Sequence, residues 1–198
     1  MAFSRWLADA HERLFPFGNT VRTDPLVLDA ARGERLAFQA AISLVDEAGA
    51  PEAVEVEAAA EATGLAVRTR RVGFVPMAHH NTDTPAEELD CRGHVPGFVP
   101  DPLFDESKVL LAKGETAAFW FTVDVPANCT PGDHEITVRL CVQTTPDPTP
   151  LAPLHATIRV HDVRIQPRRG LPVVQWFYND AILDWYRLKP FEEAFWTR

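Results

Sequence analysis

The sequence lacks any apolar run of about 18 residues, the length at which a helix can cross a bilayer. It also lacks a secretion signal, because the opening residues MAFSRWLADAHERLF are interrupted by charges and contain no unbroken apolar core. Cysteine is scarce. The three present, Cys91, Cys129 and Cys141, are odd in number and follow no ligand or disulfide spacing. These absences predict a cytoplasmic protein with reduced thiols.

Basic residues are outnumbered by acidic ones. The chain has 19 Lys and Arg against 28 Asp and Glu, and its net charge is −9. Binding to nucleic acid needs a basic face, so we expect neither nucleic acid nor a membrane as a partner. The sequence also has no Gly-x-Ser-x-Gly element, no phosphate-binding glycine loop and no dinucleotide fingerprint, so no cofactor is expected.

The dominant pattern is the alternation of apolar and polar residues that is typical of half-buried strands. Turns rich in Pro and Gly separate the strands, without helical periodicity between them. We therefore predict an all-β domain over residues 1–167, an antiparallel β-sandwich of about seven or eight strands. The expected strands include residues 36–44, 54–58, 65–75, 119–125, 136–142 and 158–163. Before them, Phe3, Trp6, Leu7, Ala10 and Leu14 are spaced as in a helix, which predicts a short N-terminal helix.

A segment of about thirty residues, Pro76–Ser107, reads as one long loop, and loops of this length are usually functional or lie at interfaces. Its potential metal ligands lack the paired spacing of a zinc site, so we predict no metal. They are His79, His80, Asp83, Asp90, Cys91 and His94. Later in the loop, prolines hold the backbone extended and present apolar groups to another surface. The predicted interface residues there are Phe98, Asp101, Leu103 and Phe104.

Paired carboxylates are the signature of glycoside hydrolysis, and two adjacent pairs occur, Asp46-Glu47 and Asp105-Glu106. The first lies in a hairpin turn beside Gly49, where acidic residues are ordinarily solvated. The second ends the long loop. We therefore predict a catalytic role for neither pair.

The composition shifts after Pro167-Arg168-Arg169-Gly170. Eight of the nineteen aromatic residues lie between positions 176 and 198. A short buried strand at 173–177 is followed by the start of an amphipathic helix at 191–196, which is the opening unit of an α/β layer. Such a unit cannot cover its own apolar faces. Residues 168–198 are therefore predicted to be a linker and the first strand and partial helix of a second, truncated domain.

Two groups of residues in this segment are candidate functional residues. Trp176 and Asp180 would lie at the carboxyl end of the strand, which is the active-site face of a (β/α)8 barrel. Asp180 would serve equally well as the N-cap of the following helix. The other group is predicted to contact the rest of the barrel or another copy of the chain, and it consists of Trp185, Tyr186, Phe195 and Trp196.

Several stretches together resemble a known family. They are Arg32-Gly33-Glu34 before Phe38-Gln39, Val72–Pro76, Pro100–Leu103, Phe119–Val123, Pro131-Gly132 before Ile136–Val138, and Leu171-Pro172 with Trp176-Phe177, Asp180 and Asp184–Tyr186. In this order and spacing, the chain resembles the N-terminal part of glycoside hydrolase family 123 and the related domain-of-unknown-function family 4091.

The resemblance implies a β-sandwich packed against a catalytic (β/α)8 barrel. It implies removal of β-linked N-acetylgalactosamine, with the substrate's acetamido group as nucleophile and an Asp-Glu pair deep in the barrel. It also implies an extended first element, against the helical spacing of Trp6–Leu14. The chain would end before that pair, and the two acidic pairs of the sandwich part do not take its place. The expected function is thus a non-catalytic accessory domain. The alternative is a stand-alone β-sandwich that binds carbohydrate or protein.

Overall fold

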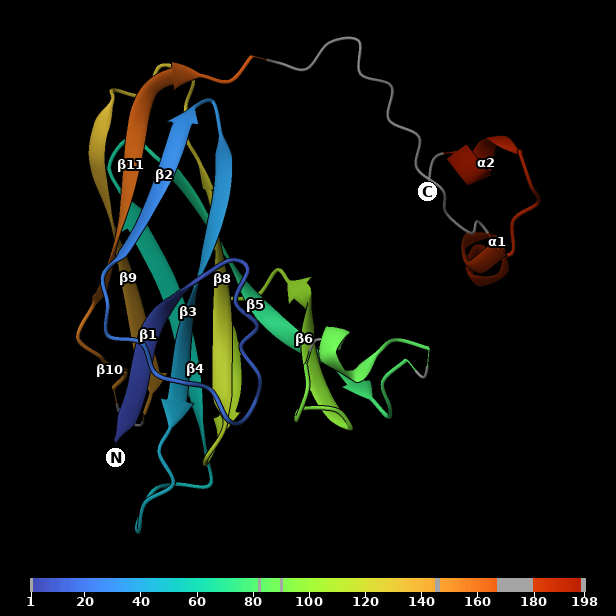
Figure 1. Cartoon of the computed structure of the whole chain (residues 1–198), viewed down its shortest axis with the longest axis horizontal. Coiled ribbons are helices and arrows are strands. Elements are labelled where there is room, and N and C mark those ends of the chain that lie inside the picture. The colour runs from blue at the N-terminus through green and yellow to red at the C-terminus, as the bar shows by residue number, and fades with distance from the viewer. Residues whose placement is uncertain (1, 82, 90, 145–146, 167–179, 197–198) are drawn as a thin grey trace. The chain divides into compact units, whose positions relative to one another are not determined.

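The computed structural model describes residues 2–81, 83–89, 91–144, 147–166 and 180–196, and these form two compact units. The first unit is Met1–Ile165 and the second is Gln166–Arg198. The first unit consists of two β-sheets (Figure 1).

The first sheet has five strands in the order β1-β3-β8-β5-β6. All its neighbours are antiparallel. The strands are β1 (Phe3–Asp9), β3 (Arg35–Leu44), β8 (Thr116–Asp124), β5 (Ala66–Met77) and β6 (Gly97–Phe104).

The second sheet has six strands, five of them in the order β2-β11-β9-β4-β7, with β10 paired to β9. They are β2 (Leu26–Arg32), β11 (Leu154–Arg164), β9 (Gly132–Gln143), β4 (Ala53–Ala62), β7 (Lys108–Ala112) and β10 (Thr149–Pro150). The all-β prediction is confirmed. The expectation of purely antiparallel pairing is wrong at one place, because β2 runs parallel to β11. No hairpin joins these two strands, so turn geometry does not impose an antiparallel direction on them.

The main core lies between the two sheets. Alternate residues of β3 and β8 form one side of it. Phe38 of β3 pairs with Phe121 of β8, and their rings stack with centroids 5.1 Å apart. The facing sheet contributes the alternating residues of β9 and β11. Fully buried members of this core include Phe38, Ile42, Leu44, Val56, Leu111, Phe119, Phe121, Ile136, Leu140 and Ile158.

A second apolar cluster covers the other face of the five-stranded sheet. Its buried members are Trp6, Ala8, Leu14, Ala41, Val72 and Ala118, and the half-buried Leu103 and Trp120 pack against them. Ala40 and Ala41 are adjacent on β3 and belong to different clusters. The centre of β3 is therefore buried on both faces.

The predicted N-terminal helix is wrong, because residues 3–9 form β1 and pair with β3. The physical reason is that β1, like β3, is buried on both of its faces. Phe3 and Leu7 pack on the main core, while Trp6 and Ala8 belong to the second cluster. A strand that is apolar on both faces can show apolar residues at helical spacing. The extended first element implied by the resemblance is the observed one.

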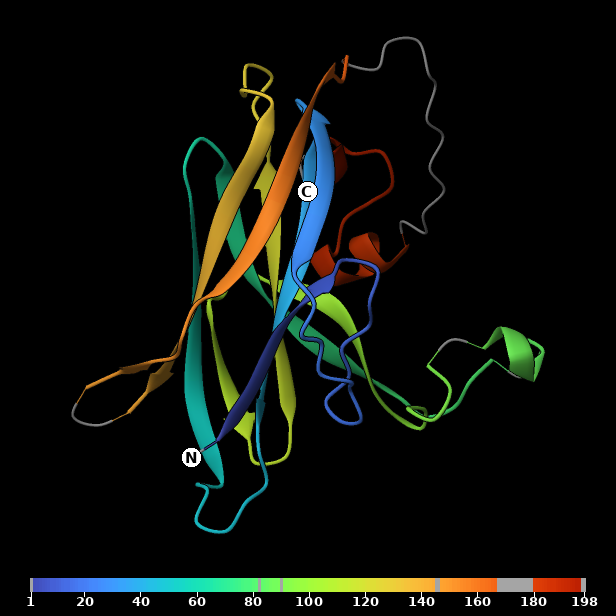
Figure 2. The ribbon, with the colours of Figure 1, turned by 60° about the vertical axis from the view of Figure 1, so that its left-hand side comes forward.

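The predicted loop Pro76–Ser107 is shorter than expected. Strand β5 continues to Met77 and pairs with β6, so the irregular part is 78–96, with a short 3-10 helix at Ala86–Glu88. Figures 1 and 2 show this segment, in green, projecting from the body of the first unit. The two prolines of β6 suggested a loop, but β6 is the last strand of its sheet, where a missing N–H is tolerated.

The second unit contains two short helices, α1 (Asp180–Tyr186) and α2 (Glu193–Trp196). Asp180 is the first residue of α1. The rings of Phe191 and Phe195 meet edge to face at 6.4 Å. The predicted strand at 173–177, with Trp176, lies outside the described residues. No helix among the described residues is long and apolar enough to span a membrane.

Replacement of Phe38 by Ala is expected to lower the free energy of unfolding by about 3–5 kcal/mol, because the ring is fully buried and leaves a cavity. Phe17→Ala is the matched control, since that ring is 56% exposed, and it should change stability by less than about 0.5 kcal/mol. Urea denaturation followed by circular dichroism measures both. Equal losses would contradict the assigned core.

Candidate functional site

The outer face of the five-stranded sheet carries a groove made of two adjoining pockets. The first has a volume of about 170 Å³ and the second about 440 Å³. They share Arg13, Pro100 and Asp101. We call the two together the outer groove. Its other lining residues are Ala10, Glu12, Gln39, Val72, Leu103 and Trp120 in the first pocket, and Val75, Met77, His80, Asn81, Cys91, Val95 and Val99 in the second.

Trp120 of β8 lines the first pocket from the side of the sheet. Trp120 pairs with Gln39 on β3 and with Arg70 on β5, so the three side chains form a row on one face of the sheet. Val72 of β5 pairs with Leu103 of β6, and both belong to the cluster against which Trp120 packs. The half-buried indole is thus supported from the neighbouring strands.

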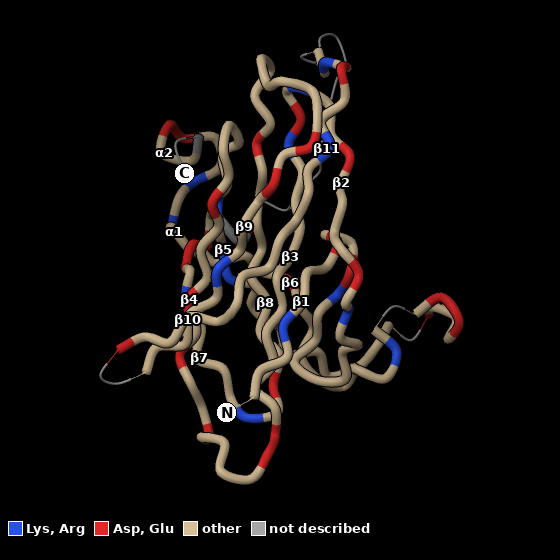
Figure 3. The backbone as a smooth tube through the Cα atoms, turned by 90° about the vertical axis from the view of Figure 1, so that its left-hand side faces the viewer, with Lys and Arg blue, Asp and Glu red and all other residues tan. Residues whose placement is uncertain are grey.

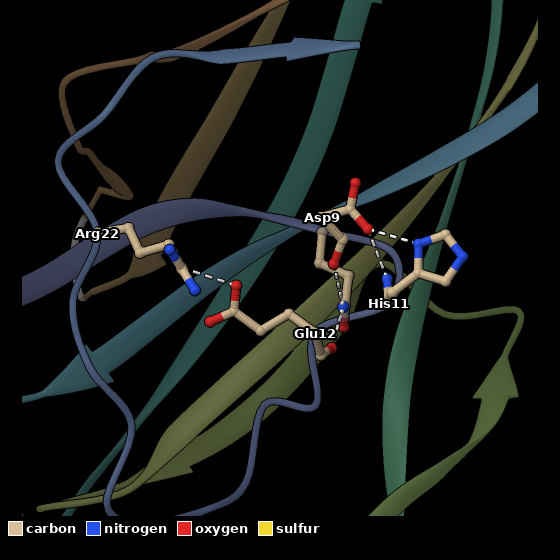
Figure 4. Close-up of polar contacts among 5 residues, drawn as sticks. Asp9, His11, Glu12 and Arg22 are labelled. Atoms are coloured by element: carbon tan, nitrogen blue, oxygen red, sulfur yellow. Dashed lines mark hydrogen bonds and ion pairs between the residues drawn. The ribbon is translucent and has the colours of Figure 1, made fainter. Parts of the chain in front are cut away.

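Gln39 fixes one wall of the groove. Its side chain is only 3% exposed, and Nε2 donates hydrogen bonds to the backbone oxygens of Asp9, at 3.0 Å, and Glu12, at 2.7 Å. These bonds hold the turn that follows β1 against the sheet, and Figure 4 labels Asp9, His11 and Glu12 of this turn. On the far side of that turn, Oε2 of Glu12 accepts a hydrogen bond from Nε of Arg22 at 2.8 Å. A buried amide therefore positions Glu12 at the rim.

Asp9 closes the same turn through its carboxylate. Oδ1 accepts hydrogen bonds from the backbone nitrogen of His11 at 2.8 Å and from Nδ1 of His11 at 2.7 Å. The backbone N–H of His11 is the main reason why the pKa of Asp9 lies below its ordinary value of 3.8, with a smaller contribution from the imidazole.

The opposite wall comes from the segment between β5 and β6. The imidazole of His94 stacks on the ring of Phe15, with centroids 3.7 Å apart and planes 5° from parallel. Nη1 of Arg13 donates a hydrogen bond to Sγ of Cys91 at 3.3 Å. Two segments far apart in sequence, 10–25 and 78–96, are thereby tied to each other beside the groove.

The predicted interface residues of β6 lie in different surroundings. Asp101 and Leu103 line the outer groove. Phe98 and Phe104 are exposed, by 53% and 41%. The guanidinium of Arg71 lies 4.4 Å from the centre of the Phe104 ring. This ring lies so close to Gly73 that a Cβ there would approach it to 2.3 Å.

The remaining predicted site residues belong to the second unit. Trp185 is 81% exposed and Tyr186 is also exposed, whereas Phe195 is buried within its unit. The side chain of Trp196 lies outside the described residues, as does Trp176. Their predicted roles in binding sugar or a partner stay predictions.

The potential metal ligands of the 78–96 segment make other contacts. His94 stacks on Phe15, Cys91 accepts from Arg13, and Nδ1 of His79 lies 3.0 Å from the backbone oxygen of His80. Within the described part of the chain, no group of three or more His, Cys, Asp or Glu side chains could hold a metal ion.

The two acidic pairs lie in surface interactions. Asp105 accepts two hydrogen bonds of 2.8 Å from Nη2 of Arg68, and Glu106 pairs with Arg71. Asp46 lies 3.8 Å from Nζ of Lys113. Acidic and basic positions are interspersed along the described backbone in Figure 3.

Sequence reasoning missed a contact between Cys129 and His134 beside a pocket of about 770 Å³. Sγ of Cys129 lies 3.6 Å from Nε2 of His134, and Nε2 lies 2.8 Å from the backbone oxygen of Thr130. Because a carbonyl oxygen only accepts, Nε2 carries the proton there. The imidazole therefore cannot act as a base toward the thiol through this nitrogen. The spacing Cys-x4-His was the signal available in the sequence.

Comparison with solved structures finds the same fold in part of a larger enzyme. A family 123 glycoside hydrolase from Clostridium perfringens, studied for glycolipid glycan hydrolysis, matches with a TM-score of 0.54 and 9% identity. The match covers 82% of this chain and 28% of that protein, so the chain spans little more than a quarter of its length. At this identity the likeness concerns the fold alone.

More distant matches include a PapD-like domain of human CEP192, with a TM-score of 0.36, 8% identity and coverage of 71% of this chain and 84% of that one. A nucleoside hydrolase-related protein from Saccharophagus degradans that is associated with carbohydrate metabolism matches with a TM-score of 0.32 and 13% identity, over 76% and 26%. Scores this low support no functional argument. No family model and no curated protein matches the chain.

Gln39→Met should lower the free energy of unfolding by about 1–3 kcal/mol, because two backbone oxygens lose their buried donor while the side-chain volume is nearly kept. Glu12→Gln, which alters only the exposed contact with Arg22, is the control and should cost less than about 1 kcal/mol. Urea denaturation measures both, and hydrogen exchange should localise the effect of Gln39→Met to residues 9–25. Protection unchanged there would contradict the anchoring role.

The carboxyl of Asp9 should titrate below 3.8 in the folded chain. As the pH falls, the unfolded state takes up this proton first. The contribution of Asp9 to stability is therefore complete above its unfolded pKa and is lost as the pH falls through its lower folded pKa. In His11→Ala the pKa should stay lowered, since the backbone N–H remains. A return to the ordinary value in an NMR titration would assign the effect to the imidazole instead.

Proposed function

We propose that this chain is the non-catalytic N-terminal accessory β-sandwich of a glycoside-hydrolase-like protein. The observation that carries the proposal is the fold likeness to a family 123 glycoside hydrolase over 82% of this chain and 28% of that enzyme. In this proposal the second unit, Gln166–Arg198, is the beginning of a (β/α)8 domain. The activity of the whole protein would be glycan hydrolysis, with β-N-acetylgalactosaminide cleavage assisted by the substrate's acetamido group as the specific form.

Surface chemistry supports a docking role for β6. Large apolar side chains are ordinarily covered when they gather at one place, and Phe98 and Phe104 are both exposed on this strand. Met77 of β5, which pairs with Gly97 next to Phe98, is exposed as well. We propose that this edge contacts the remainder of the barrel domain, as does the exposed Trp185 of the second unit. Without that domain, another copy of the chain would take its place.

The carboxylates described in the sandwich support the proposal that this part is not catalytic. A glycosidase needs one carboxyl that stays protonated and a second group on the other side of the bond that is cleaved. Asp105 and Glu106 instead accept hydrogen bonds from Arg68 and Arg71 at the surface. In the complete protein, Trp176 and Asp180 are proposed to contact the sugar.

Removal of the residues after Ile165 is expected to leave the sandwich folded, because its core is made within Met1–Ile165. The full chain should associate in gel filtration, through its exposed aromatic residues, while the shortened chain should run closer to a monomer. Circular dichroism and urea denaturation check the fold of the shortened chain. Its unfolding would show that the second unit contributes to the sandwich core and would contradict the proposal.

Substitution of both Phe98 and Phe104 by Ser tests the docking edge. The double variant should reduce association of the full chain, whereas Phe17→Ser, which changes a ring of similar exposure outside β6, should not. Sedimentation velocity over a range of concentrations measures the difference. Equal association of the two variants would assign the contact to another surface.

A further inference from the structure

We infer that the first pocket of the outer groove binds a single neutral sugar ring, with Trp120 as its platform. The inference concerns the sandwich itself. It does not depend on whether the chain docks onto a barrel domain, and its site is distinct from the exposed rings of Phe98 and Phe104.

The indole of Trp120 suits the apolar face of a sugar ring. Trp120 is half-buried and packs with Val72 and Leu103, so its ring plane is held rather than free to rotate. A fixed indole offers a flat apolar surface of large area at little cost in conformational entropy. The C–H groups on one face of a pyranose ring match such a surface, while its hydroxyl groups point outward to the walls.

The walls supply groups that recognise hydroxyls. Asp101 is exposed, and its carboxylate takes part in no ion pair or hydrogen bond found among the described residues. Arg13 adds a guanidinium, while the carboxylate of Glu12 is already bonded to Arg22. Carboxylates accept hydrogen bonds from hydroxyls, and the guanidinium donates to their oxygens. A pocket with a few placed polar groups over an apolar floor is the usual design of a small-molecule site.

Charge and size select among ligand classes. Glu12 is neutralised by Arg22, and the exposed carboxylate of Asp101 disfavours phosphate and carboxylate ligands, because like charges repel. Arg13 disfavours a quaternary amine in the same way. The volume of about 170 Å³ would hold about five or six water molecules, which is the space of one monosaccharide. The adjoining pocket of about 440 Å³ lets a longer glycan continue past Pro100 and Asp101.

The walls are held before any ligand arrives. The amide of Gln39 fixes the turn that carries Glu12, and the contacts of Arg13 with Cys91 and of Phe15 with His94 tie the two bordering segments together. Preorganisation of this kind favours binding because little motion is lost on association.

The test is saturation-transfer NMR and tryptophan fluorescence on the full chain. The probes are D-galactose, D-glucose and N-acetyl-D-galactosamine, with choline and inorganic phosphate as comparison ligands. At least one sugar should bind with a Kd on the order of 1 mM. Asp101→Asn should weaken this binding about tenfold, and Trp120→Leu should abolish it. Trp185→Leu, which changes an exposed indole in the second unit, should leave it unchanged.

Thermal unfolding and a two-dimensional amide spectrum establish that each variant keeps the fold, and Asp101→Asn, at an exposed position, keeps the test valid if Trp120→Leu does not fold. Three results would overturn the inference. They are no binding of any of the three sugars, sugar binding that Asp101→Asn leaves unchanged, and binding of choline or phosphate in preference to sugar. Failure here would leave the docking of β6 untouched, since that is measured by association.

Discussion

Burial of β3 on both faces is the constraint on which the rest of the first unit depends. Phe38, Ala40 and Ile42 face the second sheet, and between them Gln39 and Ala41 face the other way. A strand of this kind needs cover on two sides. The second sheet covers one face. The segment after β1 covers the other face, with Leu14 in the second apolar cluster. The outer groove lies beside Trp120, where the segment after β1 no longer covers the sheet.

The same constraint explains which parts of the fold the sequence could predict. Stretches with one buried face alternate plainly, as β9 and residues 119–124 of β8 do, and their prediction agrees with the structure. Strand β1 does not alternate, because Trp6, Leu7 and Ala8 are buried on opposite faces. Local periodicity then resembles a helix, and only the pairing with β3 decides otherwise. The short β7 and the parallel partner of β2 likewise depend on contacts between distant residues.

The candidate site was predictable only in part. The segment around Asp101 and Leu103 was recognised from its prolines and apolar residues, but its position beside Trp120 follows from the pairing of β5 with β8 and β6. Gln39 carried no local sign of its role, since its two acceptors lie 30 and 27 residues away. Ligand pockets that draw on several segments require the sheet order. Residue 176, predicted from the barrel-like pattern, lies outside the described residues, and the predicted role of Asp180 stays a prediction.

The prolines of β6 have a consequence for how this domain meets other molecules. Edge strands usually offer a row of backbone donors that any extended chain can join, which is a common route to aggregation. Pro100 and Pro102 withdraw two of those donors from an eight-residue edge. The β6 edge therefore presents mainly side chains to other molecules. Any molecule that contacts this border must therefore match its side chains, and the prolines hinder the addition of a further strand to the sheet.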